Sequence, residues 1–233
     1  MTLKDIKAIL FDLDGTLIDV DLKGFIPDYM KLLSNTVKHI IRPSKLISLL
    51  MKASNQIDKN DGTFTNEQLF ENSFFPLNGH SRDEINPFFD EFYEKDFIKL
   101  KIHTKIKPEA RSIVSKAFEK GYDVVIATTP IIPLTAIQQR LNWANVGDFD
   151  YKLITSIENM RANKPHEVYY AQIFDFLGLK PEECLMVGDE NKDMIAAKFG
   201  CQTYLVPSSN SNIEPTTPKP NYQGELKGLL TLL

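Results

Sequence analysis

The sequence predicts an α/β protein, built from a parallel sheet with helices on both faces and an inserted all-helical cap domain. Two observations predict the sheet: the apolar run over residues 6–11 ends abruptly in Asp12, and helix-like and strand-like segments alternate from Pro108 onward. Right-handed crossovers between parallel strands place the intervening helices on both faces. A third observation predicts the insertion, because amphipathic stretches follow one another from about Val20 to His103 without a convincing strand.

The elements can be placed in order from their start and stop signals. Pro108 in a first turn and Gly121 just past the end bound one helix, and Gly178 and Gly200 close two later ones. The Ser/Asn/Pro/Thr-rich segment 208–220 reads as a surface loop. The expected strands are 6–11, 122–128, 151–154, 184–187 and 202–206, and the expected helices are 108–120, 134–141, 166–177, 194–199 and 224–233.

The insertion divides the chain into a core, residues 1–19 and 105–233, and a cap, residues 20–104. Nine of the 15 Phe lie in the cap, and aromatic residues at helical spacing predict a second hydrophobic core rather than a recognition surface. Eleven basic and twelve acidic residues fall between positions 20 and 103, so the cap is nearly balanced in charge and shows no obvious cationic clamp.

Composition narrows the class of partner. The net charge of −4 comes without a block of one sign, which argues against nucleic acid and favours a small polar substrate. The N-terminal residues show no signal peptide, no apolar run has membrane length, and only Cys184 and Cys201 occur. We therefore expect a soluble cytoplasmic protein with reduced thiols, acting as a monomer or weak homodimer without membrane contact.

Carboxylates stand where the first strand ends. Asp12 and Asp14 are two residues apart, so they can converge on one site, and Gly15 permits a sharp exit from the strand that keeps both exposed. Ligands of parallel sheets bind beyond the carboxyl ends of the strands. The sequence thus predicts a site at this edge.

Residues 11–17, Phe-Asp-Leu-Asp-Gly-Thr-Leu, resemble the first motif of the haloacid dehalogenase-like superfamily, most of whose members are magnesium-dependent phosphatases with a Rossmann-like fold. Three further motifs follow in the order of that family. They are a strand ending in Thr128, Lys164 ahead of a helix, and a strand followed by Asp189 and Asp193. The resemblance covers residues 1 to about 19 and 105 to about 206.

The resemblance implies a role for each motif residue. Asp12 would attack phosphorus to form an aspartyl-phosphate, and Asp14 would protonate the leaving alkoxide and later activate water. Mg²⁺ would be held by Asp12, the backbone carbonyl of Asp14, and one or both of Asp189 and Asp193. Thr128 and Lys164 would bind the remaining phosphate oxygens.

A phosphatase of small phosphorylated metabolites is the first functional hypothesis. A phosphotransferase or phosphomutase is the alternative, since the same intermediate can pass to a sugar hydroxyl if water is excluded. A non-catalytic binding module stays a third possibility, and Asp14 argues against a dehalogenase. Two residues depart from the family pattern: Thr129 stands where many relatives have Asn, and Glu190 adds negative charge beside Asp189.

Other sequence features are weaker candidates for a functional site. Residues 58–63 look like a calcium loop, but the glycine falls at the fifth position, so we expect a turn. The four His show no paired ligand spacing, and Trp143 is expected to pack in the core.

Overall fold

Six short, mostly apolar segments form one parallel sheet in the computed structural model, which describes residues 3, 5–209 and 211–233. The central strand β1 pairs with β4 and β6, and Phe11 lies opposite both Ile126 and Val187. Because the strands are parallel, β4, β1 and β6 end side by side. Across the sheet the order is β5 (Leu153–Ile154), β4 (Asp123–Ile126), β1 (Ala8–Phe11), β6 (Cys184–Gly188), β7 (Gln202–Leu205) and β8 (Tyr222–Gln223).

Both faces of the sheet are covered, as the sequence predicts. Alternate side chains of β1 point to opposite faces. Ile9 and Phe11 belong to the larger core cluster, with α5 (Ala110–Glu119) and α6 (Leu134–Trp143). Ala8 and Leu10 belong to a second cluster with α7 (Glu167–Leu177). The site is therefore held by a sheet that is buried on two sides.

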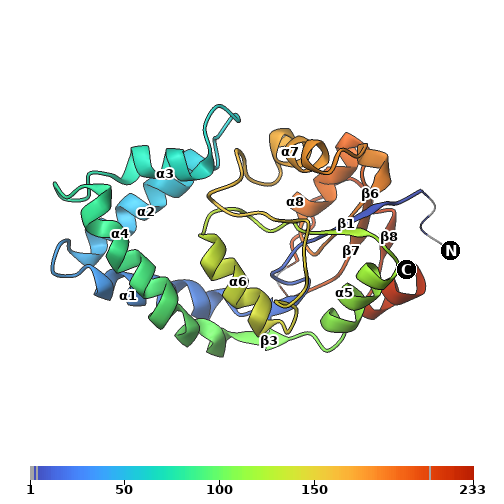
Figure 1. The fold of residues 1–233 in the computed structure, drawn as a ribbon, viewed down its shortest axis with the longest axis horizontal. Coiled ribbons are helices and arrows are strands. Elements are labelled where there is room, and N and C mark those ends of the chain that lie inside the picture. Colours follow the sequence, from blue (N-terminus) through green and yellow to red (C-terminus); the bar gives the residue numbers. More distant parts are fainter. Residues whose placement is uncertain (1–2, 4, 210) are drawn as a thin grey trace.

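A helical insertion, residues 22–103, lies at the opposite end of the molecule from the sheet, with α6 between them (Figure 1). It leaves and returns through an antiparallel ribbon that pairs β2 (Ile18–Val20) with β3 (Thr104–Ile106). Its helices are α1 (Leu22–Thr36), α2 (Pro43–Ile57), α3 (Asn66–Phe74) and α4 (Arg82–Glu91), followed by a π-helical turn (Phe92–Asp96) and a 3₁₀ helix (Phe97–His103).

The aromatic residues of the insertion pack in two places. Phe74 is buried in a cluster that belongs to the insertion alone. Phe92 and Phe97 join the main core cluster instead, and Phe97 stacks on Trp143 with ring centroids 5.3 Å apart. Packing is thus confirmed for Trp143, while the insertion's own core is smaller than its Phe content suggests.

The last elements differ from the sequence-based prediction. The segment from Asn191 is helical earlier than expected, as α8 (Asn191–Met194) followed by a 3₁₀ helix (Ile195–Phe199). The edge strand β8 was not predicted, because two residues show no periodicity, and the terminal helix is a 3₁₀ helix (Leu226–Thr231). A fourth 3₁₀ helix (Pro181–Glu183) precedes β6. Within the described ranges, no helix combines the length and apolar character needed to cross a membrane.

Candidate active site

The neighbouring ends of β4, β1 and β6 bring three predicted residues together. The Asp12 N–H donates to the Val187 carbonyl at 2.9 Å, and the Ala127 N–H donates to the Phe11 carbonyl at 2.7 Å. These bonds continue the sheet past the last paired residues. Asp12, Thr128 and Asp189 therefore leave three adjacent strands at the same edge, and all three side chains are buried.

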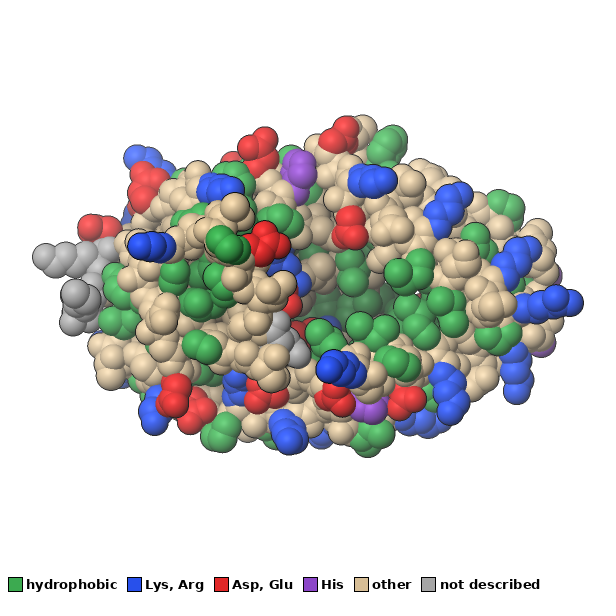
Figure 2. All heavy atoms as spheres, turned by 180° about the vertical axis from the view of Figure 1, so that it is seen from behind, with side chains coloured by type: hydrophobic (Ala, Val, Ile, Leu, Met, Phe, Trp, Pro, Cys, Tyr) green, Lys and Arg blue, Asp and Glu red, His purple; other side chains and the backbone are tan. Residues whose placement is uncertain are grey.

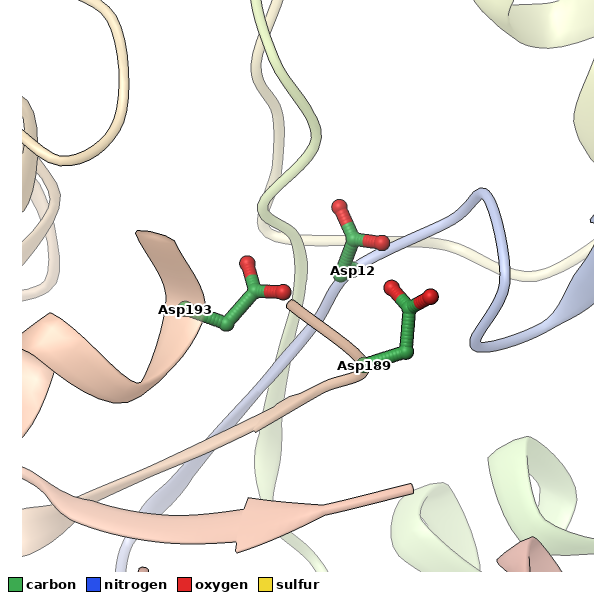
Figure 3. A group of neighbouring side chains, drawn as sticks. All are labelled: Asp12, Asp189 and Asp193. Atoms are coloured by element: carbon green, nitrogen blue, oxygen red, sulfur yellow. The ribbon is translucent and has the colours of Figure 1, made fainter. Parts of the chain in front are cut away.

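Asp12, Asp189 and Asp193 form a cluster in which one carboxylate oxygen from each lies within 4.8 Å of the others (Figure 3). Asp193 reaches the cluster from α8. Glycine makes this approach possible: Gly15 has φ +82°, and a Cβ there would collide with the Asp189 carboxylate. Likewise, a side chain at Gly188 would collide with Asp193. The sharp exit expected at Gly15 is thus confirmed, but the expectation that it keeps both carboxylates exposed is wrong for Asp12, which is only 4% exposed.

Lys164 lies inside this carboxylate cluster. Its fully buried Nζ donates to Asp12 Oδ1 at 2.7 Å and to Asp193 Oδ1 at 2.6 Å. Burial alone lowers the pKa of a lysine, but Asp12 and Asp193 outweigh it and hold the pKa of Lys164 well above its ordinary value. The ammonium is therefore charged, yet one cation faces three carboxylates.

Asp189 and Asp193 can bind a further cation. Burial, with the neighbouring Asp12, raises the pKa of Asp189 to about 7, and burial raises that of Asp193 to about 6 against the opposing effect of Lys164. Asp189 Oδ2 accepts from Ser208 Oγ at 2.5 Å, whereas Oδ1 is buried without a hydrogen-bond partner among the described residues. An all-oxygen set of this kind fits a hard divalent ion such as Mg²⁺.

Asp14 does not join the cluster; it forms an ion pair with Arg140 of α6. The Arg140 side chain is only 8% exposed, and its guanidinium carbon lies 5.7 Å from the ring centroid of Phe25 in the insertion. Burial lowers the pKa of Arg140 to about 10, partly offset by Asp12, so it remains a cation at neutral pH. The sequence analysis missed Arg140, although its place three residues after Ile137 on the buried face of a helix was a usable signal.

The carbonyl of Thr128 is fixed by two side chains that the sequence analysis also missed. Tyr169 Oη donates to it at 3.0 Å, and Thr155 Oγ1 donates to it at 2.8 Å.

The charge that Glu190 adds is balanced locally, because its Oε2 pairs with Lys192 at 2.6 Å. Cys184 and Cys201 are buried free thiols, and residues 58–63 contain the expected turn.

The buried aspartates and the lysine lie where the central strands of a parallel α/β fold end, which is where enzymes of this fold class bind their ligands. The chain belongs to the haloacid dehalogenase-like hydrolases, whose family model matches residues 6–199. It is therefore a hydrolase of this family.

Curated relatives and solved structures agree with this family. The chain is 24% identical over 217 residues to a phosphoglycolate phosphatase of Vibrio vulnificus, covering 92% of this chain and 90% of the relative. It is 27% identical over 199 residues to the pyrophosphatase PpaX of Bacillus velezensis, covering 85% and 81%. The crystal structure of a predicted phosphoglycolate phosphatase from Haemophilus somnus superposes with a TM-score of 0.60 at 19% identity and covers 98% of each chain.

Proposed function

We propose that this protein is a magnesium-dependent phosphatase that hydrolyses a small phosphorylated metabolite through an aspartyl-phosphate. The observation that carries the proposal is the position of Lys164, whose charged Nζ contacts both Asp12 and Asp193 inside a buried cluster with excess negative charge. A phosphate monoester carries nearly two negative charges, so an anionic nucleophile can approach it only where cations offset both.

Asp12 and Asp14 carry out the chemical steps of the proposed reaction. Asp12 attacks phosphorus with a carboxylate oxygen, and the bond from phosphorus to the leaving oxygen breaks as Asp14 gives that oxygen a proton. Asp14 next removes a proton from water, which attacks phosphorus and releases phosphate from Asp12. Lys164 and Thr128 bind phosphate oxygens. Arg140 orients Asp14 through their ion pair.

Asp12, the backbone carbonyl of Asp14, Asp189 and Asp193 would hold the Mg²⁺. The ion would supply positive charge for the phosphate oxygens. The arrangement favours small substrates because Asp12 and Lys164 are only 4% and 5% exposed. The names of both curated relatives, a phosphoglycolate phosphatase and a pyrophosphatase, support the same substrate size.

Asp12→Asn tests the mechanism, since it keeps the size of the side chain but removes the nucleophilic charge. We expect phosphoenzyme formation to stop and turnover to fall by roughly 10³-fold or more, with substrate binding retained. Chelation of Mg²⁺ is expected to abolish turnover of the native protein, and added Mg²⁺ to restore it. Near-native hydrolysis by the variant, or full activity in excess chelator, would refute the mechanism.

A further inference from the structure

A chamber of about 420 Å³ lies between the helical insertion and two core segments, residues 131–135, which run into α6, and residues 157–158. The surface is hollowed there, with a hydrophobic floor (Figure 2). All four helices of the insertion contribute to the wall. Leu50, Phe70 and Phe89 come from the insertion, and Ile131 and Ile157 come from the core. Binding sites for small organic molecules have this size and apolar lining.

The chamber is close to the reacting groups by two routes. Ile131 follows Thr128 by three residues, so their Cα atoms are at most about 11 Å apart. On the other side, Tyr29 of the wall stacks on Phe25 with ring centroids 6.5 Å apart, and Phe25 lies against Arg140, the partner of Asp14. A group attached to a phosphate at Asp12 could therefore extend into the chamber.

The charges of the chamber disfavour an anion. Arg82 is the one basic residue in its described lining, and Glu67 and Glu71 already bind it at 3.2 and 2.7 Å. Asp90 and Glu158 add two further acidic groups. Four carboxylates thus face one cation that is fully paired.

We propose that this chamber holds the leaving group of the substrate, and that the leaving group is an uncharged apolar or aromatic alcohol. The inference rests on the proposed phosphatase function. It distinguishes this chain from the phosphoglycolate phosphatase and the pyrophosphatase that it resembles, because glycolate carries a carboxylate and pyrophosphate releases a second phosphate. Either anion would meet the acidic wall with no free cation to bind it.

The substrate side is tested with 2-naphthyl phosphate and 4-carboxyphenyl phosphate, whose phenols have similar acidity and differ chiefly in charge. We expect kcat/KM of the native protein to be at least about tenfold higher for the naphthyl ester, and higher than for 2-phosphoglycolate or pyrophosphate. Equal or greater kcat/KM for any of the three anionic substrates would overturn the proposal.

The chamber itself is tested with Ile131→Trp, which fills it from a side chain that is 40% exposed. We expect KM for 2-naphthyl phosphate to rise about tenfold, and binding of 2-naphthol, measured by fluorescence, to weaken equally. Ile98→Trp is the matched control, because Ile98 is 45% exposed in the 3₁₀ helix Phe97–His103 and lies outside both the chamber lining and the β2–β3 ribbon. Unchanged KM and naphthol binding in Ile131→Trp would refute the assignment. If naphthol binding depends on Ile131 but the protein hydrolyses no phosphate ester, the assignment of the chamber stands and the proposed phosphatase function is wrong.

Discussion

Arg140 links the proton donor to the insertion, since it contacts Asp14 on one side and Phe25 on the other. We expect Arg140→Met to lower turnover of an alkyl phosphate by about 100-fold, because a misplaced Asp14 cannot protonate a poor leaving group. An activated aryl phosphate, which departs without a proton, should change little. Arg140→Lys should restore part of the alkyl activity. Equal loss on both substrates would show that Arg140 acts only on folding or binding.

Asp189 and Asp193 make the effect of Mg²⁺ depend on pH. Their folded pKa values, about 7 and about 6, lie above the ordinary 3.8, so the metal-free fold gains stability when they are protonated and loses it as pH rises through this window. Mg²⁺ binds the ionised form. We therefore expect the rise in Tm caused by Mg²⁺ to be several degrees larger at about pH 8 than at about pH 5. Asp189→Asn should remove most of this difference, and a pH-independent shift would contradict the assignment.

The clustered motif residues were predictable because they match, in order, the motifs of the family that residues 11–17 resemble. Parallel topology alone brings Asp12, Thr128 and Asp189 to one edge. Arg140 and Ser208 could not be assigned in this way, because their contacts depend on how α6 and the loop after β7 approach the sheet. The same holds for β8, whose two residues are set by pairing with β7 rather than by their own pattern.

At the level of elements, the turn after α2 and the first residue of α3 attach the insertion to the loop that carries Lys164. Asn66 Nδ2 donates to the Pro130 carbonyl at 3.0 Å and to Asn163 Oδ1 at 3.1 Å. Asn163 Nδ2 donates in turn to Asp58 Oδ1 at 2.8 Å. Since Asn66 is fully buried, these bonds form away from water, where an unpaired polar group is costly.

Asn66→Leu should therefore destabilise the protein and loosen the contact with the Lys164 loop. We expect the free energy of unfolding to fall by about 2–3 kcal/mol, together with a higher KM for phosphate esters. Denaturant unfolding and steady-state kinetics measure the two effects. Asn72→Leu on the same helix is the control, because Asn72 is exposed and has no side-chain hydrogen bond among the described residues. If both variants behave alike, the contact does not hold the insertion in place.

At the scale of the whole molecule, we propose that the insertion moves to admit substrate to the buried site. Asp12 is 4% exposed and Lys164 5%, so a substrate can reach them only if the structure opens. The insertion joins the rest of the chain only through segments 19–23 and 101–107, which flank the β2–β3 ribbon. We propose these segments as the hinge, and with them the boundary between a core, residues 1–19 and 105–233, and a cap, residues 20–104.

Limited proteolysis of the native protein tests this movement. Cleavage within 19–23 and 101–107 should be faster than elsewhere in the core, because hinge segments must unpair transiently as the insertion swings. Orthovanadate with Mg²⁺ should slow it several-fold, since an occupied site favours the closed arrangement. Asn66→Leu, which frees the far side of the insertion from the Lys164 loop, should accelerate the same cuts while Asn72→Leu does not. Cleavage at these segments that is no faster than elsewhere, and that responds neither to orthovanadate nor to Asn66→Leu, would mean that substrate enters by a route other than rotation about the ribbon.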